Sequence, residues 1–462
     1  MQISGRRVTT LLGAAAVGVY LLLVLGATAG LADAARACQS WPLCDGPLRD
    51  PAVAVALGHR LVAAVVGLLV VAAGVAAWVG DAGRRVRAAT AVGVALFPLQ
   101  AGVGAFVALG GATPPLPGLH LLVGVGIFGA LLLALAWRLE TETGGADDPV
   151  ASDCRPTPGD SVTADPAPTD PAPSLGPGER LVAYVRLTKP RLMWLLSLVA
   201  AAAMALAGGP DLSVRTVVLT LGGGVLAIGA SGTFNHVLER DRDRRMSRTA
   251  DRPTATDVIP ARNAAAFGGG LALLSLAAFL QVNWVTATLG LVAILFYSVV
   301  YTLVLKPNTV QNTVIGGAAG ALPALIGWAA VTGTVGLAGV VLATLVFVWT
   351  PAHFYNLALA YKDDYARGGF PMMPVVRGET TTRKHILLWT GTTLAVAVAL
   401  IRLTPLSWMA AAATTMVGGA FVWAVVRLHR EQTERAAFRA FHASNAYLGT
   451  VLVAVVLDAL AV

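Results

Sequence analysis

Long apolar stretches recur along the chain, and they predict helices that cross a membrane. A hydrocarbon core of roughly 30 Å needs about 20 consecutive apolar residues in a helix. About four such stretches come early, at residues 8–31, 53–79, 87–109 and 116–138. About nine follow, at 192–208, 214–234, 263–281, 284–305, 312–332, 336–356, 386–403, 407–427 and 439–460. The pattern therefore predicts an all-α polytopic membrane protein.

The segment between the two groups of apolar stretches has a different composition. Residues 140–178 are rich in Pro, Asp, Ser and Thr, and such a segment buries too little apolar surface to fold. We therefore expect a disordered linker at 140–178. It would separate a four-span domain at 1–139 from a nine-span domain at 179–462.

Composition and charge add an orientation to this picture. The chain is 56% hydrophobic and 13% charged, whereas soluble proteins carry about 25% charged residues. The net charge of +8 comes from basic residues in alternate loops, as at 6–7, 84–87 and 383–384. Basic loops face the cytoplasm. The N-terminus and the linker are therefore expected on the cytoplasmic side of a cell membrane, and the C-terminus on the outer side. Because topology explains the basic excess, no nucleic-acid partner is expected.

The loop after the second span of the C-terminal domain carries the first candidate site. Asn235, Glu239 and Asp243 are spaced i, i+4, i+8, so they share one face if the helix continues into the loop. An amide oxygen and two carboxylates suit Mg²⁺, which proteins often hold together with substrate phosphates. Arg248 and Arg252 follow, and arginine binds phosphate through two hydrogen bonds. The spacing predicts a metal–diphosphate site at the membrane edge.

A second charged cluster follows the sixth span of the same domain, on the same predicted side. Asp363 and Asp364 could hold a second metal ion or the far side of a diphosphate. Lys306 ends the fourth span, and Lys189 and Arg191 begin the first span on that side. Four separate loops thus bring acids and cations to one rim, and ionisable groups within membrane-embedded protein are commonly functional.

A less specific interpretation is available for each of these residues. The acidic loops could be solvated surface, and Lys189 or Lys306 could merely anchor a span. His353 lies near the inner end of the sixth span, where it could contact an acceptor substrate or be a buried hydrogen-bonding residue. The helical spacing of the acids and the presence of two clusters favour a binding site.

Four stretches of the C-terminal domain carry a family resemblance: YVRLTKPR, NHVLERDRDRRMSRTADRP, LKPNTVQNTVIGGAAGALPALIGWAA and PAHFYNLALAYKDDYARGGFPMMPVV. They resemble the UbiA superfamily of intramembrane prenyltransferases and, within it, the protohaem IX farnesyltransferases (haem O synthases). The segment Met246 to Pro253 is similar to that haem branch. The resemblance implies Mg²⁺-dependent farnesyl transfer from farnesyl diphosphate to a vinyl group of haem b, making haem O for haem–copper oxidases.

This sequence departs from the superfamily pattern in both acidic loops. His236 and Glu239 stand where the first motif has Asp. The second motif, Asp-x-x-x-Asp, has Tyr361 and Tyr365 at its ends, with Asp363 and Asp364 between them. We nevertheless expect Asn235, Glu239, Asp243, Asp363 and Asp364 to hold Mg²⁺, with Lys306 also catalytic. The diphosphate would bind to five cations: Lys189, Arg191, Arg248, Arg252 and Lys306.

The N-terminal domain offers two histidines and two cysteines as candidate chemistry. His59 and His120 lie near the outer ends of the second and fourth spans, so they could be a pair of axial haem ligands. Cys38 and Cys44 lie in an outer loop, where a disulfide can persist. The alternatives are two histidines that pack between helices and two buried thiols.

This N-terminal domain resembles one half of haem A synthase. The stretch CQSWPLC and the pair His59–Arg60 carry the resemblance, whereas Ala56 stands where that family has Glu. The second half of that family is missing. The resemblance implies that the domain holds haem b, delivers it to the transferase, or pairs with a separate haem A synthase.

Two other functions remain open at the level of the sequence. One is a UbiA-type transferase that acts on a quinone precursor or a lipid acceptor, which the segment at 246–253 disfavours. The other is a non-catalytic membrane protein that binds or transfers haem. That second function needs only the histidine pair and leaves both acidic clusters unexplained.

Overall fold

The computed structural model describes residues 5–31, 34–38, 40–80, 82–110, 115–144, 176–404 and 406–461. Within these ranges the chain forms helices and no strand. Thirteen of the described helices are long and apolar enough to cross a membrane. The prediction of an all-α polytopic membrane protein is therefore confirmed. The predicted linker lies outside the described ranges except at its two ends.

Contacts between residues divide the chain into two compact units. The first contains residues 1–146 and 383–454, and the second contains 147–382 and 455–462. The predicted domains had placed all nine later spans together. The division differs because α18 (Trp408–Glu431) packs against α1 (Gly5–Leu31) and α5 (Leu116–Thr143) in the first unit.

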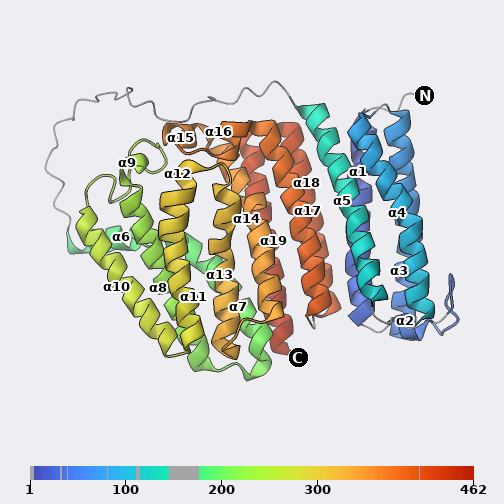
Figure 1. Ribbon diagram of the computed structural model, residues 1–462, viewed down its shortest axis with the longest axis horizontal. Coiled ribbons are helices and arrows are strands. Elements are labelled where there is room, and N and C mark those ends of the chain that lie inside the picture. Colours follow the sequence, from blue (N-terminus) through green and yellow to red (C-terminus); the bar gives the residue numbers. More distant parts are fainter. Residues whose placement is uncertain are drawn as a thin grey trace. The chain divides into compact units, whose positions relative to one another are not determined.

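The first unit contains a four-helix bundle. Besides α1, α5 and α18, the first unit contains α2 (Ala34–Ala37), α3 (Pro51–Val79), α4 (Arg84–Leu109), α17 (Glu379–Leu403) and most of α19 (Glu434–Ala461). Helix α1 packs against α3 and α5, and α4 packs against both of those helices (Figure 1). The start of α3 is fixed by Pro51 and by Asp50, whose side chain accepts a 2.9 Å hydrogen bond from the Ala52 N–H.

The second unit is built around four helices that pack side by side. These are α7 (Pro190–Gly208), α8 (Val214–Leu238), α11 (Trp284–Leu295) and α13 (Asn312–Thr332). Around them lie α10 (Ala261–Leu280) against α8 and α14 (Leu337–Ala360) against α13. The remaining elements are η1 (Gly209–Asp211), α9 (Arg240–Asp243), η2 (Phe296–Leu305), α12 (Lys306–Asn308), α15 (Lys362–Arg367) and α16 (Met373–Arg377).

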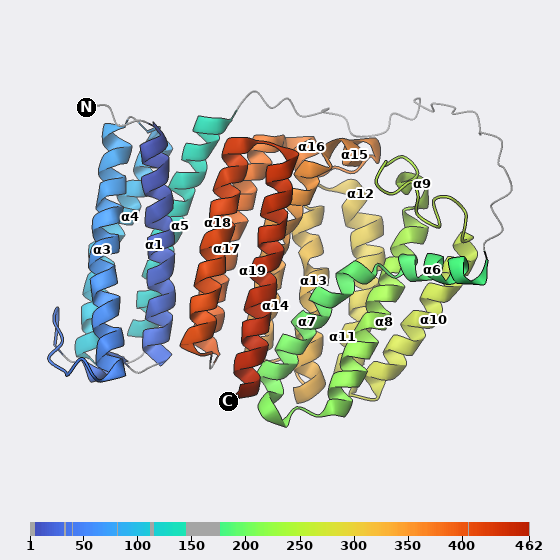
Figure 2. The same ribbon diagram turned by 180° about the vertical axis from the view of Figure 1, so that it is seen from behind.

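Helix α6 (Pro177–Leu187) differs from its neighbours in direction and in length. It lies crosswise to α8 and α10 (Figure 2). Ala183 and Leu187 are buried in a small core, whereas Leu181 and Val182 are exposed. A short helix with apolar groups on both its buried and exposed sides suits the interface of a bilayer. It leads directly into the turn that carries Lys189.

Candidate functional site

The residues predicted at i, i+4, i+8 lie on one continuous backbone stripe. The Glu239 N–H donates to the Asn235 carbonyl at 2.9 Å, and the Asp243 N–H donates to the Glu239 carbonyl at 2.8 Å. Helical hydrogen bonding therefore continues from α8 into α9. All three side chains are buried, and that of Asp243 is 0% exposed. The side chain of Asp241 on the same short helix is 73% exposed.

A second stripe, on η2 and the start of α12, faces the first. The Asn235 amide donates to the Thr302 hydroxyl at 3.2 Å, and Lys306 Nζ donates to both Glu239 oxygens at 2.6 and 2.8 Å. The η2 segment is a π-helix. Such wider turns are rare and occur frequently at functional sites. The π-helix places Thr302 and Lys306 opposite successive positions of the acidic stripe.

Lys189 is held at this cluster by an unusual backbone. Its φ of 55° and ψ of 58° are left-handed, which is uncommon for a side-chain-bearing residue and concentrates at functional sites. Its turn lies directly on α8, where a Cβ at Gly232 would be only 3.1 Å from the Leu187 carbonyl oxygen. Lys189 Nζ donates to Asn235 Oδ1 and, at 3.5 Å, to the Tyr297 hydroxyl.

The charges around the cluster determine the pKa of each group. Arg252 donates to both Asp243 oxygens, at 2.8 and 2.7 Å. Burial raises the pKa of Asp243, although Arg252 opposes this. Burial acts in the same direction on Glu239, but there Lys306 and Lys189 prevail and hold the pKa below its ordinary value. Burial, together with Arg252, lowers the pKa of Lys189 to about 7.

The second acidic loop has two neighbouring aspartates in different environments. Asp364 accepts bonds from the Ser247 hydroxyl at 2.7 Å, from the Arg248 N–H at 3.2 Å and from Arg367. Burial would raise its pKa, yet the hydrogen bonds from Ser247 and Arg248 lower it. Asp363, by contrast, is exposed. Asp364 therefore joins the two charged loops, whereas Asp363 faces outward.

Arg248 lies between these loops and contacts aromatic rings. Its guanidinium carbon is 4.8 Å from the ring centre of Tyr361 and 5.5 Å from that of Tyr365, within the range of cation–π attraction. Lys306 Nζ lies 4.4 Å from the ring centre of Phe370. Aromatic rings at both ends of the second acidic loop thus contact Arg248, and the ring of Phe370 after it contacts Lys306.

Besides Asp363, two predicted residues are not brought into the cluster. Arg191 is exposed on the first turn of α7. His353 stacks on Trp349, with ring centres 4.3 Å apart and planes 15° apart. Their roles in diphosphate and acceptor binding remain predictions.

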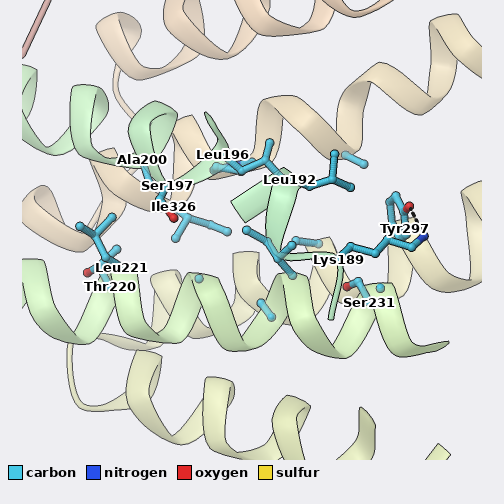
Figure 3. A pocket seen from close by; sticks show the side chains of 17 residues that line it. Lys189, Leu192, Leu196, Ser197, Ala200, Thr220, Leu221, Ser231, Tyr297 and Ile326 are labelled. Carbon is cyan, nitrogen blue, oxygen red and sulfur yellow. Dashed lines mark hydrogen bonds between the residues drawn. The ribbon is translucent and has the colours of Figure 1, made fainter. Parts of the chain in front are cut away.

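An apolar cavity lies next to the charged cluster. It lies between α7, α8, α11–η2 and α13 and is partly open to the surroundings. Lys189, Tyr297 and Ser231 line one end (Figure 3). Thr220, Leu221 and Ala200 line the opposite end. A mostly apolar cavity with polar groups at one end is typical of a small-molecule site.

The histidine pair of the first unit lies within one bundle. The ring centres of His59 on α3 and His120 on α5 are 6.5 Å apart, with planes at 67°. Each ring has a buried Nδ1 without a hydrogen-bond partner among the described residues. Gln100 Nε2 lies 3.3 Å from His120 Nε2.

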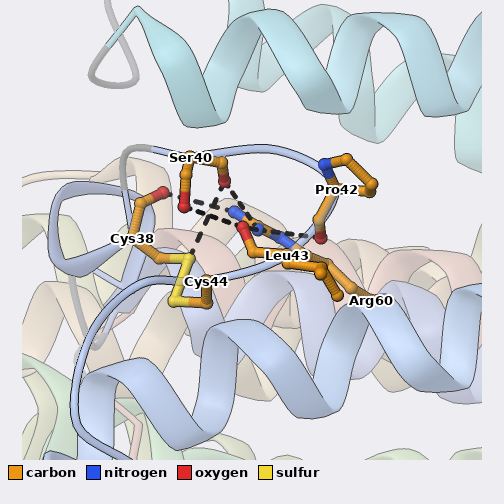
Figure 4. The surroundings of a disulfide bond; sticks show 6 residues. All are labelled: Cys38, Ser40, Pro42, Leu43, Cys44 and Arg60. Carbon is orange, nitrogen blue, oxygen red and sulfur yellow. Dashed lines mark hydrogen bonds between the residues drawn. A yellow bond between two sulfur atoms is a disulfide. The ribbon is translucent and has the colours of Figure 1, made fainter.

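The loop before α3 is closed by a disulfide between Cys38 and Cys44, whose Cα atoms are 5.3 Å apart (Figure 4). Arg60, beside His59, donates to the carbonyls of Ser40, Pro42 and Leu43 at 2.8, 3.1 and 3.0 Å, and to that of Cys38 at 3.2 Å. One guanidinium thus fixes the path of the disulfide loop over the start of α3.

Comparison with known proteins identifies the family. Residues 195–446 match the UbiA prenyltransferase family. The protoheme IX farnesyltransferase of Haloarcula marismortui is 64% identical to this chain over 99% of both chains. The chain belongs to the UbiA prenyltransferase family. The predicted resemblance of the C-terminal domain to this family is confirmed.

Two further relatives of this UbiA protein inform its architecture. Protoheme IX farnesyltransferase 1 of Saccharopolyspora erythraea is 42% identical and covers 64% of this chain but 97% of its own length. About a third of the present chain therefore has no counterpart in that relative. A solved structure described as digeranylgeranylglyceryl phosphate synthase has 15% identity and a TM-score of 0.51, covering 62% of this chain and all of its own. It shares the fold.

Three residues of the UbiA site are missing from the sequence-based predictions. Tyr297 contacts Lys189, and Thr302 contacts Asn235, from a predicted span without charged residues. Ser247 binds Asp364 across a long separation in the chain. Only the run of charges around Ser247 gave a signal, and no signal marked the other two.

Proposed function

We propose that this protein transfers a farnesyl group from farnesyl diphosphate to a vinyl group of protohaem IX (haem b). The product would be haem O, for the assembly of haem–copper oxidases. The observation that carries the proposal is a buried cluster of cations and carboxylates at one end of an apolar cavity. It occurs in a UbiA chain that is 64% identical over nearly its full length to a relative named protoheme IX farnesyltransferase.

The charged residues divide into two groups by what they would bind. Lys189, Arg252 and Lys306 converge on one buried place and would bind the diphosphate oxygens. Arg248, held on aromatic rings beside them, would contact its outer side. Asn235 would orient Lys189, to which its amide oxygen is bonded.

The donor set also fits Mg²⁺. Asn235, Glu239 and Asp243 offer hard oxygens on one stripe, and Glu239 is close enough to raise the pKa of Asp243. No group of three or more acidic, histidine or cysteine side chains suited to a metal alone occurs in the described ranges. Mg²⁺ needs none, since it is usually held by one or two carboxylates and substrate phosphates. When bound, it would neutralise charge on the leaving diphosphate.

The reaction would begin by cleavage of the bond between farnesyl C1 and the diphosphate oxygen. The electron pair leaves with the oxygen, where Lys189, Arg252 and Lys306 stabilise the developing negative charge. The vinyl group of haem b attacks the allylic cation. Water adds to the resulting cation and loses a proton, which leaves a hydroxyethylfarnesyl chain, diphosphate and one proton as products.

The test uses the purified full chain with haem b, farnesyl diphosphate and Mg²⁺. Mass analysis of extracted haem should find the hydroxyethylfarnesyl product with the wild type. Glu239→Gln should reduce its rate by about 100-fold or more. Asp241→Asn, from the same loop but exposed, is the matched control and should retain activity. Transfer to a quinone precursor and not to haem would overturn the proposal.

The histidine pair of the first unit suits a haem in a second role. The ring centres of His59 and His120 are 6.5 Å apart, and each ring has a buried Nδ1 without a partner among the described residues. Both residues would hold haem b, as cofactor or as substrate for transfer, and a haem A synthase would be a suitable partner.

Absorption spectra of the purified protein test this haem site. His59→Ala and His120→Ala should each abolish the spectrum of a haem with two histidine ligands. His442→Ala, which removes an exposed histidine of α19, is the control and should preserve that spectrum. Unchanged spectra in both of the first two variants would contradict the assignment.

The orientation of the chain follows from the same proposal. The acidic loops would face the cytoplasm, and the loop of Cys38 and Cys44 would lie outside. Labelling of single introduced cysteines in intact cells with an impermeant reagent distinguishes the two sides. Labelling of Asp363→Cys from outside would refute this orientation.

A further inference from the structure

The cavity beside the cluster has a defined direction. Its cationic end contains Lys189, whose amine is bonded to Asn235 of the acidic stripe. The lining on α8 then runs from Ser231 back to Thr220 (Figure 3). Thr220 is 1% exposed and Ile326 of α13 is 6% exposed. These buried residues form the end of the lining away from the charges.

The length of this lining can be compared with prenyl chains. At about 1.5 Å per residue, the helical path from Ser231 to Thr220 is about 16 Å. An extended carbon chain advances about 1.3 Å per bond, given bonds of about 1.5 Å. By this measure a geranyl chain is about 9 Å long, a farnesyl chain about 14 Å and a geranylgeranyl chain about 19 Å. The farnesyl chain is the longest that fits.

We infer that the closed end formed by Thr220, Ala200 and Ile326 limits the prenyl donor to three isoprene units. This inference rests on the proposed function, since it assigns the tail of the same substrate. The diphosphate lies at the Lys189 end, and the tail extends along α8 away from it. A geranylgeranyl tail would have to displace the residues at this end, of which Ile326 is packed in a hydrophobic core and Thr220 and Ala200 are buried.

Gly224 provides a direct test because it lines the cavity part-way along. A Cβ at this position would meet no atom within 4 Å, so Gly224→Leu places its side chain in the cavity without a backbone clash. Leucine also favours the helix more than glycine does. Gly224 lies about 10 Å along the helix from Ser231, which leaves room for a geranyl chain but not for a farnesyl chain.

Gly222 supplies the matched control on the same helix. A Cβ there also meets no atom within 4 Å, yet Gly222 is exposed and does not line the cavity. Gly222→Leu should therefore leave donor selection unchanged. Ile326→Ala tests the opposite change, because it removes bulk at the closed end and should admit a longer tail.

The experiment measures binding of geranyl, farnesyl and geranylgeranyl diphosphate to the full chain without haem, by competition with radiolabelled farnesyl diphosphate. Gly224→Leu should weaken farnesyl relative to geranyl binding by about tenfold or more. Ile326→Ala should improve geranylgeranyl relative to farnesyl binding. Transfer to haem b is then measured with each donor and should follow the same order.

Two results would overturn the inference. One is an unchanged preference in both Gly224→Leu and Ile326→Ala. The other is an equal shift in Gly224→Leu and Gly222→Leu. Failure of the proposed function would look different. The wild type would then transfer no prenyl group to haem, while the binding preferences would still decide the role of the cavity.

Discussion

The two neighbouring aspartates of the second acidic loop allow a sharp test of what that loop does. Asp364 accepts bonds from Ser247 and Arg248, and Asp363 is exposed. If Asp364 mainly joins the loops, Asp364→Asn should impair the site by displacing Arg248. Asp363→Asn should then be nearly silent. If the loop instead holds a metal, the requirement for Mg²⁺ should change.

The size of the effect follows from the bonds. The Asp364 oxygens accept from the Ser247 hydroxyl at 2.7 Å, the Ser247 N–H at 3.3 Å and the Arg248 N–H at 3.2 Å, besides Arg367. An amide has one acceptor oxygen, so its NH₂ group must face donors on one side. Losing a hydrogen bond to a charged group costs about 1.5–3 kcal/mol. This predicts a fall in turnover of about 10- to 150-fold.

The assay is haem farnesylation across a series of Mg²⁺ concentrations in four variants. These are Asp364→Asn, Ser247→Ala, the double variant and Asp363→Asn. If Asp364 joins the two loops, the effects of Asp364→Asn and Ser247→Ala on turnover should be strongly non-additive, because both variants break the same hydrogen bond. The half-saturating Mg²⁺ concentration should then be unchanged. A tenfold rise of that concentration in Asp364→Asn but not in Ser247→Ala would refute the reasoning.

Three further expectations concern stability. Lys306→Met leaves Glu239 buried without its cation, so the free energy of unfolding should fall by about 3–5 kcal/mol. Adding Glu239→Gln should restore part of that loss. Thermal unfolding in detergent measures both changes. Because the pKa of Asp364 is lowered, its contribution is present above its ordinary value of about 3.9 and is lost as the pH falls through the folded pKa. Acid unfolding below about pH 4 should therefore be less pH-dependent in Asp364→Asn. Arg60→Met should speed amide exchange in residues 38–44 by about tenfold with the disulfide intact, and unchanged exchange would count against the role of Arg60.

The spans and the acidic stripe could be predicted because they depend on local periodicity. The predicted span at 214–234 became α8, Val214–Leu238, and its helical hydrogen bonding continues through Asp243. Apolar length and an i, i+4, i+8 spacing are visible in any sequence. The helical repeat alone was enough to place Asn235, Glu239 and Asp243 on one face.

Lys189, Arg252 and Lys306 beside that stripe were predicted from their charge. Tyr297 and Thr302 could not be predicted, because their placement departs from regular helical periodicity. Tyr297 and Thr302 are five residues apart, and a regular α-helix does not bring that spacing to one face. The π-helix does, with the Thr302 hydroxyl donating to the Tyr297 carbonyl at 2.8 Å. Likewise, Asp363 and Asp364 are equivalent in sequence. Successive positions on α15 point in different directions, and only the packing against Ser247 selects one of them.

The pairing of charges in the cluster bears on how it would act. Lys189 is bonded to the neutral side chains of Asn235 and Tyr297, whereas Lys306 is held by Glu239 and Arg252 by Asp243. Pairing of this kind lowers the cost of burying Lys306 and Arg252. A diphosphate must draw these cations away from their carboxylates, and the carboxylates are then available to Mg²⁺. Part of the binding energy is thereby used to exchange partners, which keeps ground-state binding moderate. Catalysis benefits only from interactions that strengthen in the transition state. Negative charge grows on the departing diphosphate, so the cations should grip it most strongly after the C1–oxygen bond begins to break.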